Sequence, residues 1–287
     1  MKPWTTWTMC VGAVLLTVLI GFGAAACGGD DGDGFDASDD GAAGRGSGEL
    51  TFYVSGEDLV TDGFISKDEW WIRFDHFWVN IAEFTAYQEP IETKHMGHPH
   101  EDIPTDAAHE TVPVTQMLDL AAEGRLMLSH VEDAPAGNYN FVNFTLAPSP
   151  DGDLAGYSMV MTGSAQKNGR VVEFAIPVST QLKYVDCEHR ETDPYAGVVE
   201  PGGEGEVEIT LHVDHLFGNA QHTEHAHVVN NLALGFEPFA EYAAENGYVI
   251  DMAPVEEILD ADDYAAFIEA LREAGHSGEG HCSVDSD

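Results

Sequence analysis

Strand-like segments dominate residues 49–215, and in residues 206–214 apolar and polar residues alternate with the period of two that is typical of a β-strand. The segments concerned are rich in β-branched and aromatic residues, and the expected strands cover residues 49–54, 69–87, 138–147, 156–165, 169–178, 180–187 and 206–214. Turn residues separate most of them, and Asn168-Gly169 is typical of a tight hairpin. Because strands and helices do not alternate, the pattern predicts a mainly β protein, an antiparallel β-sandwich over residues 49–215.

From residue 216 onward the apolar residues recur with helical spacing, in residues 232–247 and again in residues 254–275. In the second segment one helical face holds Tyr264, Phe267, Ile268 and Leu271. We therefore expect residues 216–287 to form a histidine-rich junction and a C-terminal helical cap that packs on the sandwich.

The first 27 residues predict a signal for export. Their apolar run, residues 11–22, is shorter than the about 20 residues that a membrane-spanning helix needs. It is followed by three alanines and Cys27, an arrangement that resembles the lipobox of bacterial lipoproteins, in which the matching cysteine is lipidated. An ordinary signal peptide cleaved nearby is the alternative. Gly28 stands where an aspartate would retain a lipoprotein at an inner membrane, so we expect the protein to be anchored in a bilayer through Cys27, at an outer membrane or cell surface.

Residues 28–48 consist mostly of glycine, alanine, serine and aspartate and predict a solvated tether between the anchor and the domain. The whole chain has 51 acidic against 11 basic residues, for a formal net charge of −40. Such a charge repels nucleic acid and attracts cations, so nucleic acid is not expected as a partner. It is equally typical of a protein that is soluble in a salty medium, so acidity alone does not indicate a metal function.

Two cysteines, Cys187 and Cys282, remain outside the export signal. In an oxidising compartment they predict a disulfide that ties the C-terminal segment to the body of the domain. The alternative is a zinc site in which His189 and His281, within two residues of the cysteines in sequence, complete a set of four ligands.

The densest group of metal-binding residue types lies in residues 211–229. Alternation along residues 206–214 places His212 and Asp214 together on the polar face of a strand, and His215 follows at its end. A helical turn over residues 219–227 would bring His222 and His225 to one face. The sequence thus predicts a site for zinc, or less favourably copper, with these candidate ligands: His212, Asp214, His215, His222, His225 and His227.

Two further places hold histidines with a weaker case for metal binding. His95, His98 and His100 lie with a methionine on a loop that could capture Cu(I), although a mobile acidic loop is the plainer interpretation. His76 lies within an aromatic strand, where a packed, hydrogen-bonded histidine is favoured over a metal ligand. The neighbouring aromatic residues are expected in the core rather than on a carbohydrate platform; they are Trp70, Trp71, Phe74, Phe77 and Trp78.

Three functions remain open from the sequence. The leading one is metal capture or delivery through the cluster at residues 212–227. The second is a structural or interaction sandwich whose histidines are incidental. The third is a mononuclear zinc hydrolase with Glu224 as general base, although the sequence shows neither a nucleophile nor an oxyanion loop. Whether the protein is an enzyme is left open, with a binding protein favoured.

Several segments resemble uncharacterised bacterial lipoproteins that carry a transthyretin-like β-sandwich. The resemblance rests on Cys27 and on the segments WWIRFDHFWVNI, PAGNYNFVNFTL, LHVDHLF and GEGHC, and it extends loosely over residues 49–287. It implies a sandwich fold and a surface location, and it implies no activity.

Overall fold

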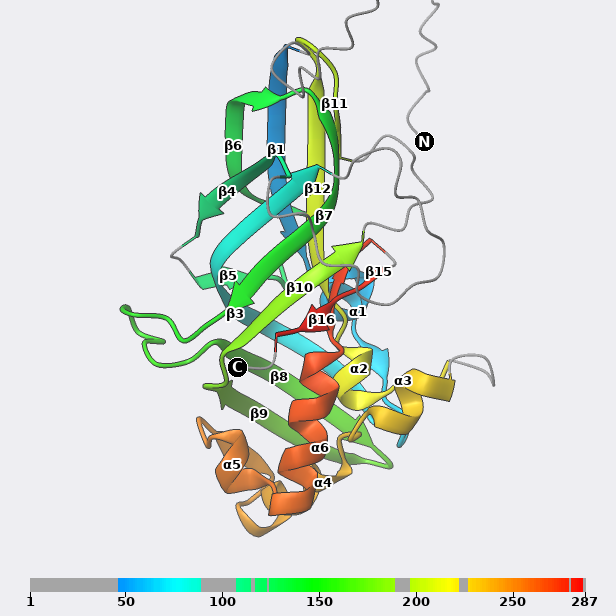
Figure 1. Ribbon diagram of the computed structural model, residues 1–287. Coiled ribbons are helices and arrows are strands. Elements are labelled where there is room, and N and C mark those ends of the chain that lie inside the picture. The colour runs from blue at the N-terminus through cyan, green and yellow to red at the C-terminus, as the bar shows by residue number, and fades with distance from the viewer. Residues whose placement is uncertain are drawn as a thin grey trace, which may run out of the picture. The chain divides into compact units, whose positions relative to one another are not determined.

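The computed structural model describes residues 46–88, 107–114, 117–122, 124–188, 197–221, 227–278 and 280–285. In these residues two β-sheets form the body of the domain (Figure 1). The smaller sheet has five strands, in the spatial order β15 (Gly280–His281), β14 (Gly275–Ser277), β12 (Glu204–Leu211), β1 (Ser47–Ser55) and β6 (Leu126–Pro135).

The larger sheet is organised around the long strand β3. Its main path runs β13 (Val249–Asp251), β9 (Arg170–Val178), β8 (Met159–Lys167), β3 (Trp71–Gln88), β7 (Gly137–Leu146), β10 (Leu182–Glu188) and β16 (Ser283–Val284). Three short strands also pair with β3, namely β2 (Phe64–Ile65), β4 (His109–Pro113) and β5 (Met117–Asp119), and β11 (Val198–Val199) pairs with β7.

The two sheets share one hydrophobic core, which is what the alternating pattern predicts. Phe52 on β1 meets Phe84 on β3 edge-on, with 4.9 Å between ring centroids, and both side chains are fully buried. Asn168 and Gly169 join β8 to β9 with φ angles of 50° and 79°, as expected for a two-residue hairpin turn. The mainly β class predicted from the sequence is therefore confirmed.

The direction of two strands differs from the all-antiparallel prediction. β1 runs parallel to β12, with Phe52 opposite Val207, and β13 runs parallel to β9. Between β1 and β12 the chain forms β6 of the smaller sheet and most strands of the larger sheet, and parallel strands need a long connection of this kind. Periodicity records which side of a strand is buried and carries no information about strand direction.

The helices of the described residues are α1 (Glu57–Asp62), α2 (Asp214–Phe217), α3 (His227–Leu232), α4 (Glu237–Glu245), α5 (Val255–Ile258) and α6 (Ala261–Arg272). Helices α4, α5 and α6 fall in the two segments where helical spacing was found. Asp260 caps α6 by accepting hydrogen bonds from two backbone amides, and Phe267 and Leu271 on its predicted face are fully buried. The helices do not end the chain as a C-terminal cap would, because β14, β15 and β16 follow α6 and return to the two sheets.

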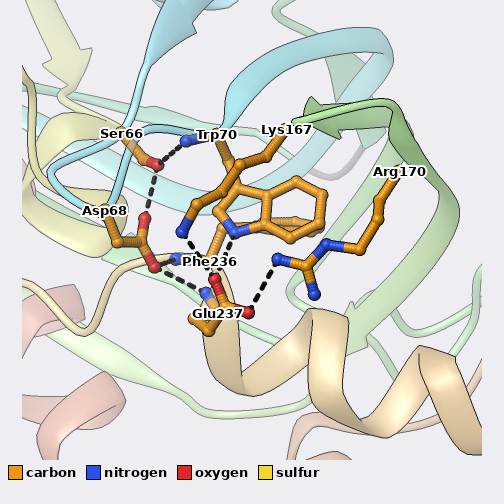
Figure 2. A network of polar contacts seen from close by, with 7 residues as sticks. All are labelled: Ser66, Asp68, Trp70, Lys167, Arg170, Phe236 and Glu237. Carbon is orange, nitrogen blue, oxygen red and sulfur yellow. Dashed lines mark hydrogen bonds and ion pairs between the residues drawn. The ribbon is translucent and has the colours of Figure 1, made fainter.

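Helix α4 is fixed to the larger sheet by a network around Glu237 (Figure 2). The Glu237 carboxylate accepts hydrogen bonds from the Trp70 indole (3.0 Å), Lys167 (2.8 Å) and Arg170 (3.0 Å). Burial raises the pKa of Glu237, but the hydrogen bonds from Lys167, Trp70 and Arg170 and the charge of Lys167 outweigh it and lower that pKa to about 2. At the start of the helix, where backbone amides have no partner within the helix, the Asp68 carboxylate accepts a hydrogen bond from the Glu237 amide at 2.6 Å.

The last described residues connect the two sheets to each other. After β14 and β15 in the smaller sheet, the chain continues into β16, where Val284 pairs with Tyr184 of β10 in the larger sheet (Figure 1). The predicted disulfide Cys187–Cys282 is present and joins β10 to the residue between β15 and β16. The chain is thus cross-linked where it passes from one sheet to the other.

Candidate metal centre

His212 and His215 are placed by the end of strand β12. The side chains of Val207, Ile209, Leu211 and Val213 are buried, as the alternation predicts, but the strand ends at Leu211 rather than at residue 214. The backbone then turns: the His212 amide donates to the Ala274 carbonyl at 2.9 Å, and the His215 amide donates to the His212 carbonyl at 3.2 Å. His215 therefore lies on the short helix α2, which begins three residues after the end of β12.

A third histidine comes from the other end of the chain. β14 pairs antiparallel with the end of β12, so that His276 stands opposite Thr210. This pairing brings His276 next to the two histidines at the end of β12. One ring nitrogen from each of His212, His215 and His276 lies within 4.8 Å of the others.

The rings of these histidines pack directly on each other. His212 and His276 are stacked, with centroids 3.9 Å apart and ring planes 14° from parallel. His215 presents its ring at a steep angle to both, with its centroid 5.0 Å from His276 and 6.1 Å from His212. For the three imidazoles to share one ion, the stacked rings of His212 and His276 would have to move apart and turn toward a common point.

His276 is the buried member of the group. Its side chain is 3% exposed; Nε2 donates a hydrogen bond to the Glu273 carbonyl at 3.2 Å, and Nδ1 is buried without a hydrogen-bond partner. Burial lowers the pKa of His276 to about 2, and the nearby His212, His281 and His215 act in the same direction. The imidazole is therefore neutral at ordinary pH, which is the form that binds metal.

His212 is half-buried and contacts a carboxylate. Its Nε2 lies 3.1 Å from the Thr210 hydroxyl and 3.3 Å from Oε1 of Glu57. Glu57 is the first residue of α1 and has a left-handed backbone conformation with φ of 56°. A carboxylate on the far nitrogen of an imidazole is the arrangement that commonly orients histidine ligands in metal sites.

The structure brings together only part of the predicted ligand set. Asp214, which the sequence places on the polar face of a strand, is instead buried in the first turn of α2, because β12 ends three residues earlier, and it does not belong to the group of three. His222 and His225, like the proposed base Glu224, lie outside the described residues, and of His227 only the backbone, at the start of α3, is described.

The secondary candidates do not add to this site. His76 on β3 is hydrogen-bonded to Asp119 at 2.7 Å and stacked on Trp78, but it is 53% exposed rather than packed in the core. The aromatic residues near His76 differ in burial. The side chains of Trp70, Phe74 and Phe77 are buried, as predicted, whereas Trp71, also expected in the core, is 43% exposed. The lipidation candidate and the loop histidines lie outside the described residues; they are Cys27, His95, His98 and His100.

The disulfide decides between the two predictions for the cysteines. Because Cys187 and Cys282 are bonded to each other, they cannot serve as thiolate ligands, and the alternative of a zinc site built on both cysteines is wrong. His281, which that alternative assigned to zinc, instead lies beside the other histidines, with its ring 4.1 Å from His276.

His276 is the residue that sequence reasoning missed. A signal was present in the segment HSGEGH, where two histidines flank a glycine-rich turn that is typical of a hairpin. The helical spacing of residues 254–275 predicts that this segment belongs to a helical cap, which gives no reason to group its histidines with those of residues 212–215. Only the pairing of β14 with β12 shows that the two segments meet.

No helix in the described part of the chain has the length and apolar character of a membrane span. Comparison with known proteins gives no further guide to this site, because no family model, no curated protein and no solved structure matches the chain.

Proposed function

We propose that this protein is an exported, lipid-anchored protein that binds a divalent transition metal, with zinc favoured, through His212, His215 and His276. The observation that carries the proposal is the convergence of three imidazoles to within 4.8 Å, one of them buried with an unpaired ring nitrogen. A buried nitrogen without a partner costs about 1–3 kcal/mol, and a metal ion would remove that cost.

The donor chemistry favours zinc. Imidazole nitrogen suits zinc, copper and nickel, whereas calcium and magnesium prefer oxygen ligands. The group contains no thiolate or thioether, which would favour Cu(I). Three protein ligands with room for a fourth are a common arrangement for zinc.

Supporting groups hold two of the three rings. The Glu273 carbonyl accepts from Nε2 of His276, which makes Nδ1 the ligating nitrogen of that residue. Glu57 and Thr210 contact Nε2 of His212, and we take Nδ1 as its ligating nitrogen as well. Such contacts fix the tautomer and the orientation of each ring before a metal arrives.

Charge and compartment support a role in capture at a surface. The formal net charge of −40 concentrates cations near the protein, and the disulfide indicates folding in an oxidising, exported environment. Lipidation at Cys27 and retention at an outer membrane or cell surface belong to this proposal and rest on the lipobox-like sequence. Mass spectrometry of the exported chain would test them, by showing or failing to show a lipid on Cys27.

The experiment that tests metal binding is titration of the full chain, produced without a histidine tag, with Zn²⁺ followed by calorimetry and by metal analysis after dialysis. We expect one tightly held zinc per chain, and its loss in each of His212→Ala, His215→Ala and His276→Ala. His130→Ala is the matched control, since His130 is a half-exposed histidine on β6 of the same sheet. Retention of zinc by all three site variants would refute the proposal.

A further inference from the structure

A fourth histidine lies at the edge of the proposed site. The ring centroid of His281 is 4.1 Å from that of His276 and 5.4 Å from that of His215. His281 is on β15, which forms a hairpin with β14, and its position opposite His276 in the register places both residues at the same level of the sheet. Unlike His276, it is exposed to solvent.

These distances are close to those of a four-imidazole zinc site. With Zn–N bonds of about 2.0–2.1 Å, the ring centroids of two imidazoles on a tetrahedral zinc lie roughly 5 Å apart. The separations of His215 from His276 and from His281, 5.0 and 5.4 Å, match this value. The two rings beside His276, at 3.9 and 4.1 Å, would have to move away from it by about 1 Å, and His212 and His215, at 6.1 Å, would have to approach each other by about 1 Å. His281 is outside the tight group of three, so it must also turn toward it.

The fold keeps His281 within reach of the other rings. The next residue, Cys282, is bonded to Cys187 of β10, and its backbone amide donates to the Gly275 carbonyl at 3.1 Å. Beyond it, the Asp285 amide donates to the Lys183 carbonyl at 2.9 Å. A two-residue strand has few hydrogen bonds of its own, so the disulfide is the strongest restraint on the position of this imidazole.

We propose that His281 is the fourth ligand of the metal site, an exposed imidazole that closes over an ion held by His212, His215 and His276, and that the Cys187–Cys282 disulfide holds it in place. The inference rests on the proposed function. It identifies the site as a closed one with four protein ligands, which suits storage or structural binding and leaves no open position for a water nucleophile. A hydrolytic role for the site is therefore disfavoured.

The test counts histidine ligands directly. X-ray absorption spectroscopy of the zinc-loaded full chain should give four imidazoles per zinc in the native protein and three in His281→Ala. We expect zinc to be bound at least about tenfold more weakly by His281→Ala, still with one zinc per chain, since the three ligands that already lie within 4.8 Å of one another remain. His130→Ala should leave both the ligand count and the affinity unchanged.

The role of the disulfide needs a separate variant. Replacing both cysteines by serine avoids thiol reductants that would themselves bind zinc. We expect Cys187→Ser/Cys282→Ser to weaken zinc binding to the level of His281→Ala and to add little when combined with it, because both changes act on the same ligand. Near-ultraviolet circular dichroism would establish that the double variant is folded.

The outcomes separate this inference from the function on which it rests. If the native chain binds zinc through three imidazoles and His281→Ala binds it equally well, the fourth ligand is wrong and the proposed function stands. If His281→Ala is weakened but the double serine variant, shown to be folded, is not, the part assigned to the disulfide is wrong. If the native chain binds no zinc, both proposals are wrong.

Discussion

The stacked rings of His212 and His276 join two segments that are far apart in sequence, with 3.9 Å between their centroids. One histidine follows strand β12, and the other lies on β14 close to the end of the chain. The contact exists because Thr210 and Leu211 pair with His276 and Gly275 across the smaller sheet.

Zinc should stabilise the native protein and leave His276→Ala unaffected. A ligand that binds only the folded state adds about 2.7 kcal/mol of stability at a concentration of 100 times its Kd. Thermal unfolding with and without zinc would measure this as an increase in Tm. If zinc raises the Tm of His276→Ala by the same amount, zinc binds to other histidines of the chain and not to this site.

Glu57→Gln should weaken zinc binding by roughly 10–100-fold without changing its stoichiometry, because Glu57 contacts Nε2 of His212 and would orient the ring. Asp58→Asn is the matched control, since it removes the same charge from the next residue of α1. If the two variants lose affinity equally, general electrostatic attraction explains the effect and Glu57 has no specific role. Calorimetric titration of both variants makes the comparison.

Gly275→Ala should destabilise the fold and the metal site together. A β-carbon at Gly275 would overlap the ring of Tyr184, which is fully buried and donates to the Leu271 carbonyl at 2.5 Å. Such overpacking costs about 1–3 kcal/mol and would displace the neighbouring His276. Urea unfolding should show the loss, and part of it should be recovered when Tyr184→Leu is combined with Gly275→Ala. Additive effects of the two substitutions would contradict this explanation.

Removing the disulfide should lower the free energy of unfolding by about 4–5 kcal/mol in the chain-entropy model, given the 95-residue separation of Cys187 and Cys282. Urea unfolding of the metal-free Cys187→Ser/Cys282→Ser variant measures this quantity apart from any effect on zinc. A loss below about 1 kcal/mol would show that the pairing of β16 with β10 is sufficient to hold the segment.

Glu237 should make the protein sensitive to acid in a defined range. Its folded-state pKa of about 2 is lower than its ordinary value of 4.5, so its contribution to stability is complete above the ordinary value and is lost as the pH falls from 4.5 toward 2. Glu237→Gln should therefore lose less stability than the native protein between about pH 5 and about pH 3. Glu241→Gln, an exposed glutamate on the same helix, should behave like the native protein.

The sequence alone determined the class of the fold, because burial in a strand repeats every second residue and can be read without knowing any partner strand. Val207, Ile209 and Leu211 are buried as predicted, and the helical face of Phe267 and Leu271 is buried as well. The turn at Asn168-Gly169 and the disulfide also followed from local chemistry and from the number of cysteines outside the export signal. The domain boundaries and the lipid anchor remain predictions.

Only the tertiary structure decided which histidines meet. Sequence reasoning grouped neighbours in the chain, and it found His212 and His215 because both lie near the end of one strand. It could not find His276 and could not place His281 beside it, since strand pairing between β12 and β14 joins residues that share no local pattern. It assigned Asp214 to the strand, although the strand stops at Leu211 and the next residues turn into α2. A metal centre depends on distances across the fold, and those are set by the register of strands rather than by the spacing of residues along the chain.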